Sequence, residues 1–231
     1  MIEIIFEIGY VFAGFILGVY FEKFNENRKD KSWLEKALKS IRYDLTRDHE
    51  LFEKTINVDQ KQIDDDLDVF NKINADTSIT DFFSYLDDLN DNSGYDKHFG
   101  NLTGEDYDFI DLNRVNYDAF LKFGNKDGID DNKLKGNLDW LFEGLTFLYR
   151  SEISELRENI IKVDAFCTKV GYSRDFKDPI EETYNSLFIK QFKAIYSNYL
   201  NSRKKHILIK RQMVDMLSWL PEMIDETLKK L

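Results

Sequence analysis

Hydrophobic positions along this chain follow two patterns. Residues 4–21 form an apolar run that only Glu7 interrupts. Further on, apolar residues recur mostly at spacings of three and four, with a gap at Asp48-His49, which is close to the pattern of long amphipathic helices. They are Leu34, Leu38, Ile41, Leu45, Phe52, Ile56, Ile63, Leu67 and Phe70, and later Leu134, Leu138, Leu141, Leu145, Leu148, Ile153, Leu156, Ile160, Val163, Phe166 and Val170. We therefore predict an all-α fold.

The apolar run predicts a membrane-spanning helix. At about 1.5 Å per residue its 18 residues cover roughly 27 Å, close to the hydrocarbon thickness of a bilayer. A secretory signal peptide is the competing interpretation, but no basic segment precedes the run and no small-residue cleavage site follows it. We predict a transmembrane helix over residues 1–22.

The remaining residues, 23–231, predict one soluble helical domain. It divides into a long helix over residues 23–75, short helices and loops over 76–130, and two long helices over 131–231. The chain contains only two prolines, so its helices can run long. The economical arrangement is an elongated antiparallel bundle, with a coiled-coil-like body that continues from the membrane helix.

Small residues within the span offer a surface for association with another helix. Gly9, Ala13, Gly14 and Gly18 are the small residues, and Gly14 with Gly18 makes a G-x-x-x-G motif. The alternative is that glycine is simply common in membrane helices. Glu7 lies about one turn inside the run, where it either reaches the near membrane surface or faces a polar interior.

Two blocks of the chain resemble a family of uncharacterised bacterial single-span membrane proteins. The first block comprises Glu7-Ile8, Gly14, Gly18, Phe24-Asn25-Glu26 and Arg28-Lys29, with Phe24 where the family usually has tryptophan. The second comprises Tyr117-Asp118-Ala119-Phe120-Leu121-Lys122, Gly124 and Asn132-Lys133-Leu134. The resemblance implies an architecture, a membrane helix followed by a long helical body, and no activity.

The charges that flank the span predict its orientation. No Lys or Arg precedes it, whereas several follow within the next twenty residues. They are Lys23, Arg28, Lys29, Lys31, Lys36 and Lys39. Because basic flanks stay on the cytoplasmic side, we expect a bacterial inner-membrane protein whose carboxyl-terminal body is cytoplasmic.

Composition limits the partners that we expect. A net charge of −11 makes nucleic acid an improbable partner, since nucleic-acid binders present a basic face. The single cysteine, Cys167, excludes an internal disulfide and a cysteine-based zinc site, and we interpret it as a core residue. Asp64, Asp65 and Asp66 are interpreted as a solvated face, because three consecutive helical carboxylates point in different directions. We expect no metal and no cofactor.

One basic cluster is a candidate surface for lipid or a protein partner. It comprises Arg203, Lys204, Lys205, Lys210 and Arg211. Such a cluster could meet anionic lipid headgroups or an acidic helix face, and a plain solvated surface is the alternative.

Catalysis has little support in the sequence. Neither a P-loop, a G-x-G-x-x-G motif nor an H-E-x-x-H motif is present. Arg42 and His49, separated by six residues, resemble the Arg-x(4–6)-His motif of HEPN ribonucleases. In that chemistry a histidine acts as general acid or base while an arginine steadies the phosphate. Arg42 and His49 are weak catalytic candidates here, because the acidic residues around them would repel RNA.

Three hypotheses for function follow from these patterns. The first is a membrane-anchored helical interaction or scaffold protein that forms homo-oligomers. The second is an oligomeric pore or membrane effector of a bacterial antiviral or stress system, for which Glu7 and the small residues are the only support. The third is a HEPN-like, metal-independent ribonuclease.

Overall fold

A computed structural model describes the backbone of residues 2–91, 111–123, 132–173 and 177–231, and within these ranges the side chains from residue 30 onward except those of Asn90, Asp91 and Phe123. Every regular element within these ranges is helical, so the all-α prediction is confirmed. The elements are α1 (Ile2–Lys72), α2 (Ile79–Asp91), α3 (Val115–Phe123), α4 (Asn132–Asp139), the π-helical segment η2 (Trp140–Leu145), α5 (Thr146–Thr168) and α6 (Ser186–Lys230).

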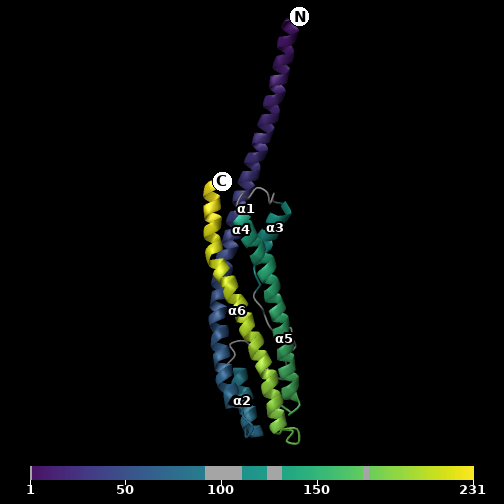
Figure 1. Cartoon of the computed structure of the whole chain (residues 1–231), viewed down its shortest axis with the longest axis vertical. Coiled ribbons are helices and arrows are strands. Elements are labelled where there is room, and N and C mark those ends of the chain that lie inside the picture. The colour runs from purple at the N-terminus through teal and green to yellow at the C-terminus, as the bar shows by residue number, and fades with distance from the viewer. Residues whose placement is uncertain (1, 92–110, 124–131, 174–176) are drawn as a thin grey trace. The chain divides into compact units, whose positions relative to one another are not determined.

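Helix α1 is unbroken over 71 residues, as Figure 1 shows. It therefore joins the predicted membrane-spanning run, residues 4–21, to the first amphipathic stretch without a loop. The side chains of the run itself lie outside the described residues. Within the described residues, no helix is long and apolar enough to cross a bilayer.

The chain divides into two compact units. Unit 1 contains Met1–Thr46, Asn113–Asp139 and Trp219–Leu231, and unit 2 contains Arg47–Leu112 and Trp140–Ser218. The core of unit 1 is aliphatic and aromatic, with contributions from α1, α3, α4 and the end of α6. Its buried side chains include Leu34, Leu38, Ile41, Leu45, Tyr117, Phe120, Leu134, Leu138, Leu220 and Ile224.

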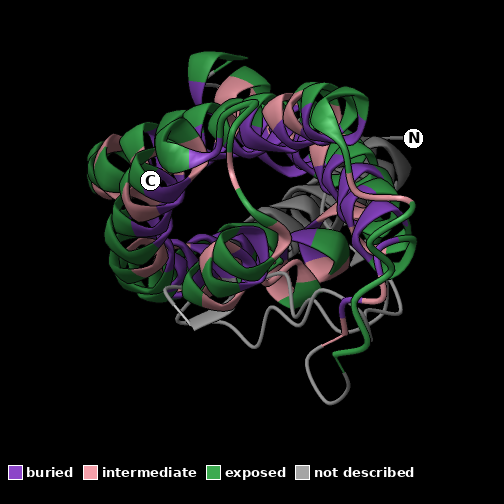
Figure 2. Cartoon of the chain, turned by 90° about the horizontal axis from the view of Figure 1, so that it is seen from below, coloured by how far each residue is buried: buried purple, intermediate pink, exposed green. Residues whose placement is uncertain are grey.

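Unit 2 is built from α2, α5 and the adjoining parts of α1 and α6. Contacts pair Asp59 with Lys210 and Phe70 with Tyr196, so α1 and α6 run antiparallel. Helix α6 is antiparallel to α5 as well, because Tyr149 stacks on His206 while Phe166 stacks on Phe188. It follows that α1 and α5 run in the same direction. Along each helix the buried positions form one side and the exposed positions the other (Figure 2).

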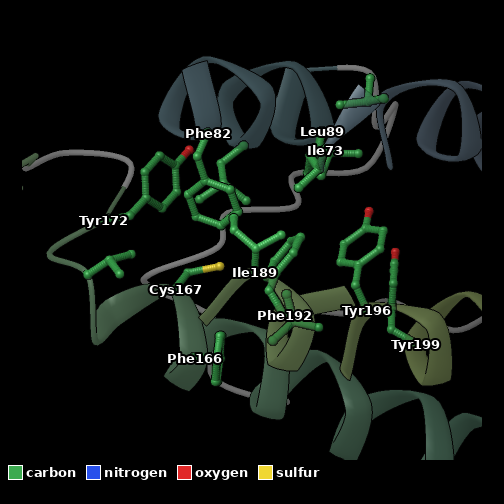
Figure 3. Close-up of a cluster of buried hydrophobic side chains, with 14 of the residues drawn as sticks. Ile73, Phe82, Leu89, Phe166, Cys167, Tyr172, Ile189, Phe192, Tyr196 and Tyr199 are labelled. Atoms are coloured by element: carbon green, nitrogen blue, oxygen red, sulfur yellow. The ribbon is translucent and has the colours of Figure 1, made fainter. Parts of the chain in front are cut away.

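An aromatic cluster forms one end of the core of unit 2. Phe82 of α2 contacts Phe188 at 5.7 Å and Phe192 at 4.9 Å between ring centroids, both edge to face. Figure 3 shows Phe82, Tyr172, Ile189 and Phe192 converging from different segments. Cys167 is fully buried in this cluster, as predicted for a core residue. The cluster attaches the short helix α2 to α5 and α6.

Local contacts and backbone conformation define two of the helix ends. The Ser78 hydroxyl accepts a hydrogen bond from the Asp81 amide and donates one to the Asp81 carboxylate, which caps the start of α2. Gly171 follows the end of α5 with φ of 76°, a left-handed conformation that favours glycine.

The last helix begins later than its proline suggests. Because proline favours the first position of a helix, Pro179 predicts a helix start there, but α6 begins at Ser186. The Asn185 side chain accepts hydrogen bonds from the Leu187 and Phe188 amides, at 3.0 and 2.9 Å. Side-chain capping at Asn185 therefore determines where α6 begins.

Replacing Phe82 by Ala should destabilise unit 2, because the change empties a fully buried position that contacts several rings. We expect a loss of about 3–5 kcal/mol in the free energy of unfolding. Urea unfolding of the full chain in mild detergent, followed by circular dichroism, measures it. Leu187→Ala is the matched control, because Leu187 is 61% exposed and its truncation should change stability little. An equal effect of both substitutions would contradict this core assignment.

Candidate functional site

A network of buried charged side chains lies between α1 and α6 in unit 2. The Lys210 ammonium donates a hydrogen bond to the Asp59 carboxylate at 2.6 Å. The Arg203 guanidinium donates to Asp66 at 3.3 Å and to the Gln62 side-chain oxygen at 2.7 Å. All five side chains are buried, with Asp66 fully so. Two carboxylates balance two cations, so this buried-charge network carries no net charge.

Helical spacing explains why these residues meet. Asp59, Gln62 and Asp66 follow one another at intervals of three and four along α1. Arg203 and Lys210 are seven residues apart on α6, which is two helical turns. Each set therefore lies on one side of its helix, and the antiparallel arrangement pairs them.

His206 lies on the same side of α6, between the two cations. Its ring stacks on Tyr149 of α5, with centroids 4.9 Å apart and an interplanar angle of 25°. Burial, together with the smaller effects of the nearby Lys210 and Arg203 charges, lowers the pKa of His206 to about 3. His206 is therefore neutral at physiological pH.

The role of the buried-charge network is to fix the relative alignment of α1 and α6 rather than to form a reactive site. A register shift of either helix would leave buried charges without their partners, which costs several kcal/mol. Within the described residues, no group of three or more His, Cys, Asp or Glu side chains is placed to hold a metal ion. The arrangement is suited to holding the two helices in one alignment.

The five residues of the predicted basic cluster do not form one exposed surface. Arg203 and Lys210 are buried in the network, which corrects that expectation. Lys205 is exposed and pairs with Glu155 of α5 at 3.1 Å, and Arg211 donates to the Gln60 side chain at 3.0 Å. Lys204 is exposed. Apolar neighbours at heptad positions could have indicated that Arg203 and Lys210 face inward.

The carboxylate run on α1 needs a similar correction. Asp64 is exposed and Asp65 half-buried, but Asp66 is fully buried against Arg203. Three consecutive helical residues do point in different directions, and Asp66 is the one that points into the core. The interval of seven residues between Asp59 and Asp66 places both on one side of α1 and could have indicated that Asp66 is buried.

The weak catalytic candidates lie seven positions apart on α1. The Arg42 guanidinium pairs with Asp225 of α6, Nε to Oδ1, at 2.7 Å. His49 is partly buried. In the structure, Arg42 is thus engaged with a carboxylate of the same unit.

Another buried carboxylate, that of Asp44, organises contacts within unit 1. Asp44 accepts hydrogen bonds from the Asn113 and Asn116 side chains, at 2.9 and 2.7 Å. Trp33 of α1 stacks on Phe120 of α3, with centroids 6.1 Å apart. These contacts attach α3, which carries part of the second family-like block, to α1. The sequence did not single out Asp44 as a buried acceptor.

The residues predicted to act in the membrane lie in α1, but their side chains lie outside the described residues. They are Glu7, Gly9, Ala13, Gly14 and Gly18. Their proposed roles in association or in a polar path stay predictions.

Several large apolar side chains of the helical body are exposed. On η2 and α5, Trp140 is 51% and Phe147 72% exposed. Gly144 allows the Trp140 ring to lie against the backbone, since a Cβ on Gly144 would approach that ring to 2.2 Å. Trp140 is therefore not a core residue. Exposed apolar side chains of this size are candidate contact residues.

A comparison of the chain with family models, with curated proteins and with solved structures finds no match.

Removing one partner of the ion pair between Asp59 and Lys210 should be costly. Asp59→Ala leaves the Lys210 charge buried without this carboxylate, and we expect a loss of about 3–5 kcal/mol in the free energy of unfolding. The double substitution Asp59→Leu with Lys210→Met replaces the pair by apolar side chains and should recover most of this loss. Urea unfolding of both variants measures the difference. A double variant that is less stable than Asp59→Ala would contradict the assignment.

Stability should fall as the pH is lowered from 6.5 toward 3, partly because of His206. In this window the unfolded histidine, with its ordinary pKa of 6.5, binds a proton that the folded one, with a pKa of about 3, does not. Protonation therefore favours unfolding, by up to about 1.4 kcal/mol per pH unit. His206→Phe should reduce this slope in urea unfolding measured across the window. Equal slopes for His206→Phe and the parent would refute this role.

Proposed function

We propose that this protein is a membrane-anchored helical interaction protein that assembles with copies of itself. The observation that carries the proposal is the apolar run of residues 4–21, which lies in the same unbroken helix as the start of the helical body. A run of this length and polarity is suited to a bilayer. A helix without a loop transmits position and orientation from the anchor to the body.

The helical body supports the interaction role. The buried-charge network holds α1 and α6 in one register, so the outer faces of the bundle keep a defined pattern. Exposed apolar side chains such as Phe147 and Trp140 lie on these faces. Gly14 and Gly18 add a small-residue motif through which membrane helices can associate.

The other two hypotheses have less support. The ribonuclease would need Arg42 to bind phosphate, and this side chain pairs with Asp225. The pore would need Glu7 to line a polar path, and its side chain lies outside the described residues. We therefore propose the interaction protein alone.

Charged substitutions in the run should detach the protein from membranes. Ile16→Asp with Leu17→Asp places two carboxylates near the middle of the span, each costing about 2.5–3.5 kcal/mol there. We expect the unsubstituted chain in the membrane pellet after an alkaline carbonate wash, and the variant largely in the supernatant. Ile16→Leu with Leu17→Ile is the matched control and should remain in the pellet. Release of the unsubstituted chain by carbonate would refute the proposal.

A further inference from the structure

Two exposed helix faces of unit 2 have complementary character. The first, which we call the α1 face, carries basic and apolar side chains: Arg47, Leu51, Lys54, Val58 and Lys61. The second, the α5 face, carries apolar, small and acidic side chains: Phe147, Ser151, Ser154, Glu158 and Ile161. All ten positions are exposed, and both faces repeat at spacings of four and three. This spacing allows one helix to pack along another.

The apolar members of the two faces are unusually exposed for their size. Leu51 is 43% and Val58 44% exposed on the α1 face, while Phe147 is 72% and Ile161 46% exposed on the α5 face. Burying them against each other would remove apolar surface from water at about 25 cal/mol per Å².

The two faces also match in height along the bundle. Helices α1 and α5 run in the same direction, and the rings of Phe52 and Tyr149 are in contact, 5.9 Å between centroids. Leu51 and Phe147 lie beside this contact, one and two positions before it. Lys61 and Glu158 each lie nine residues beyond it, so they are at the same level.

Charge favours contact between unlike faces over contact between like faces. The α1 face carries three cations and no carboxylate, whereas the α5 face carries one carboxylate and no cation. Glu158 pairs with Lys162 at 3.8 Å, and both side chains are exposed. An exposed pair of this kind contributes little stability, so it can be exchanged for contacts with a neighbour. Arg47 pairs with the buried Asp48 at 3.1 Å, so Lys54 and Lys61 are the cations that the α1 face offers to a neighbour. Two α1 faces would repel each other.

We infer that the α1 face of one copy packs against the α5 face of the next copy. The inference rests on the proposed function, because anchoring in one membrane gives neighbouring copies the same orientation and the same height. In that arrangement α1 and α5 meet in parallel, with Leu51 near Phe147 and Lys61 near Glu158. Because the two surfaces differ, the contact is head to tail and propagates to further copies, closing into a ring if the rotation allows.

Cysteine cross-linking of the full chain in membranes tests this contact. Lys54→Cys and Ser151→Cys lie two residues beyond Phe52 and Tyr149, at one level, and leave Lys61 and Glu158 in place. With a short bismaleimide, we expect cross-linked dimers when the two variants are mixed and none with either alone. The chain carrying both cysteines should give a ladder of multimers. Lys190→Cys, exposed on α6, is the control and should not cross-link to Ser151→Cys.

Charge reversal adds a readout that general misfolding cannot mimic. Lys61→Glu should lower the cross-linking yield at least several-fold, and adding Glu158→Lys should restore it. Cross-linking of Lys54→Cys to itself, or no cross-linking in a mixture that remains oligomeric and membrane-bound, would overturn the inference alone. A membrane-bound monomer would overturn both the inference and the self-assembly in the proposed function. A chain that carbonate releases would overturn the proposed anchoring.

Discussion

The pairing of buried charges between α1 and α6 is the constraint on which the body of this protein depends. Asp59 and Asp66 on one helix meet Lys210 and Arg203 on the other, and all four side chains are buried. An apolar seam between two long helices tolerates sliding by a turn, whereas buried ion pairs do not. The network therefore selects one alignment, and with it the pattern of side chains that the outer surface presents.

The buried-charge network lies on the same helix as the proposed membrane anchor, which links the anchor to the proposed function. Helix α1 carries both the apolar run and the buried carboxylates, so one unbroken helix would both anchor the chain and organise its body. The outer faces of a body that cannot change register are suited to repeated contacts with identical neighbours.

Heptad patterning predicted most of the fold, because burial of apolar stripes dominates the formation of long helices. Leu34, Leu38, Ile41 and Leu45 are buried as their spacing required. Charged residues at core positions were misassigned, since a single helix does not reveal whether its partner offers a countercharge. Asp66 and Arg203 are such residues. Local capping was also underestimated, because the Asn185 side chain determines the start of α6 and Pro179 does not.

The central claim, that the beginning of α1 lies in lipid, is tested most directly by thiol accessibility in intact vesicles. Single cysteines placed at each position from 8 to 27, in a chain with Cys167→Ser, would be treated with a water-soluble maleimide. The account predicts protection at every position through the apolar run, on all sides of the helix, and reactivity from about position 24 onward. Reactivity that alternates with the 3.6-residue period through the run would contradict it, because protection on one side alone indicates packing against protein.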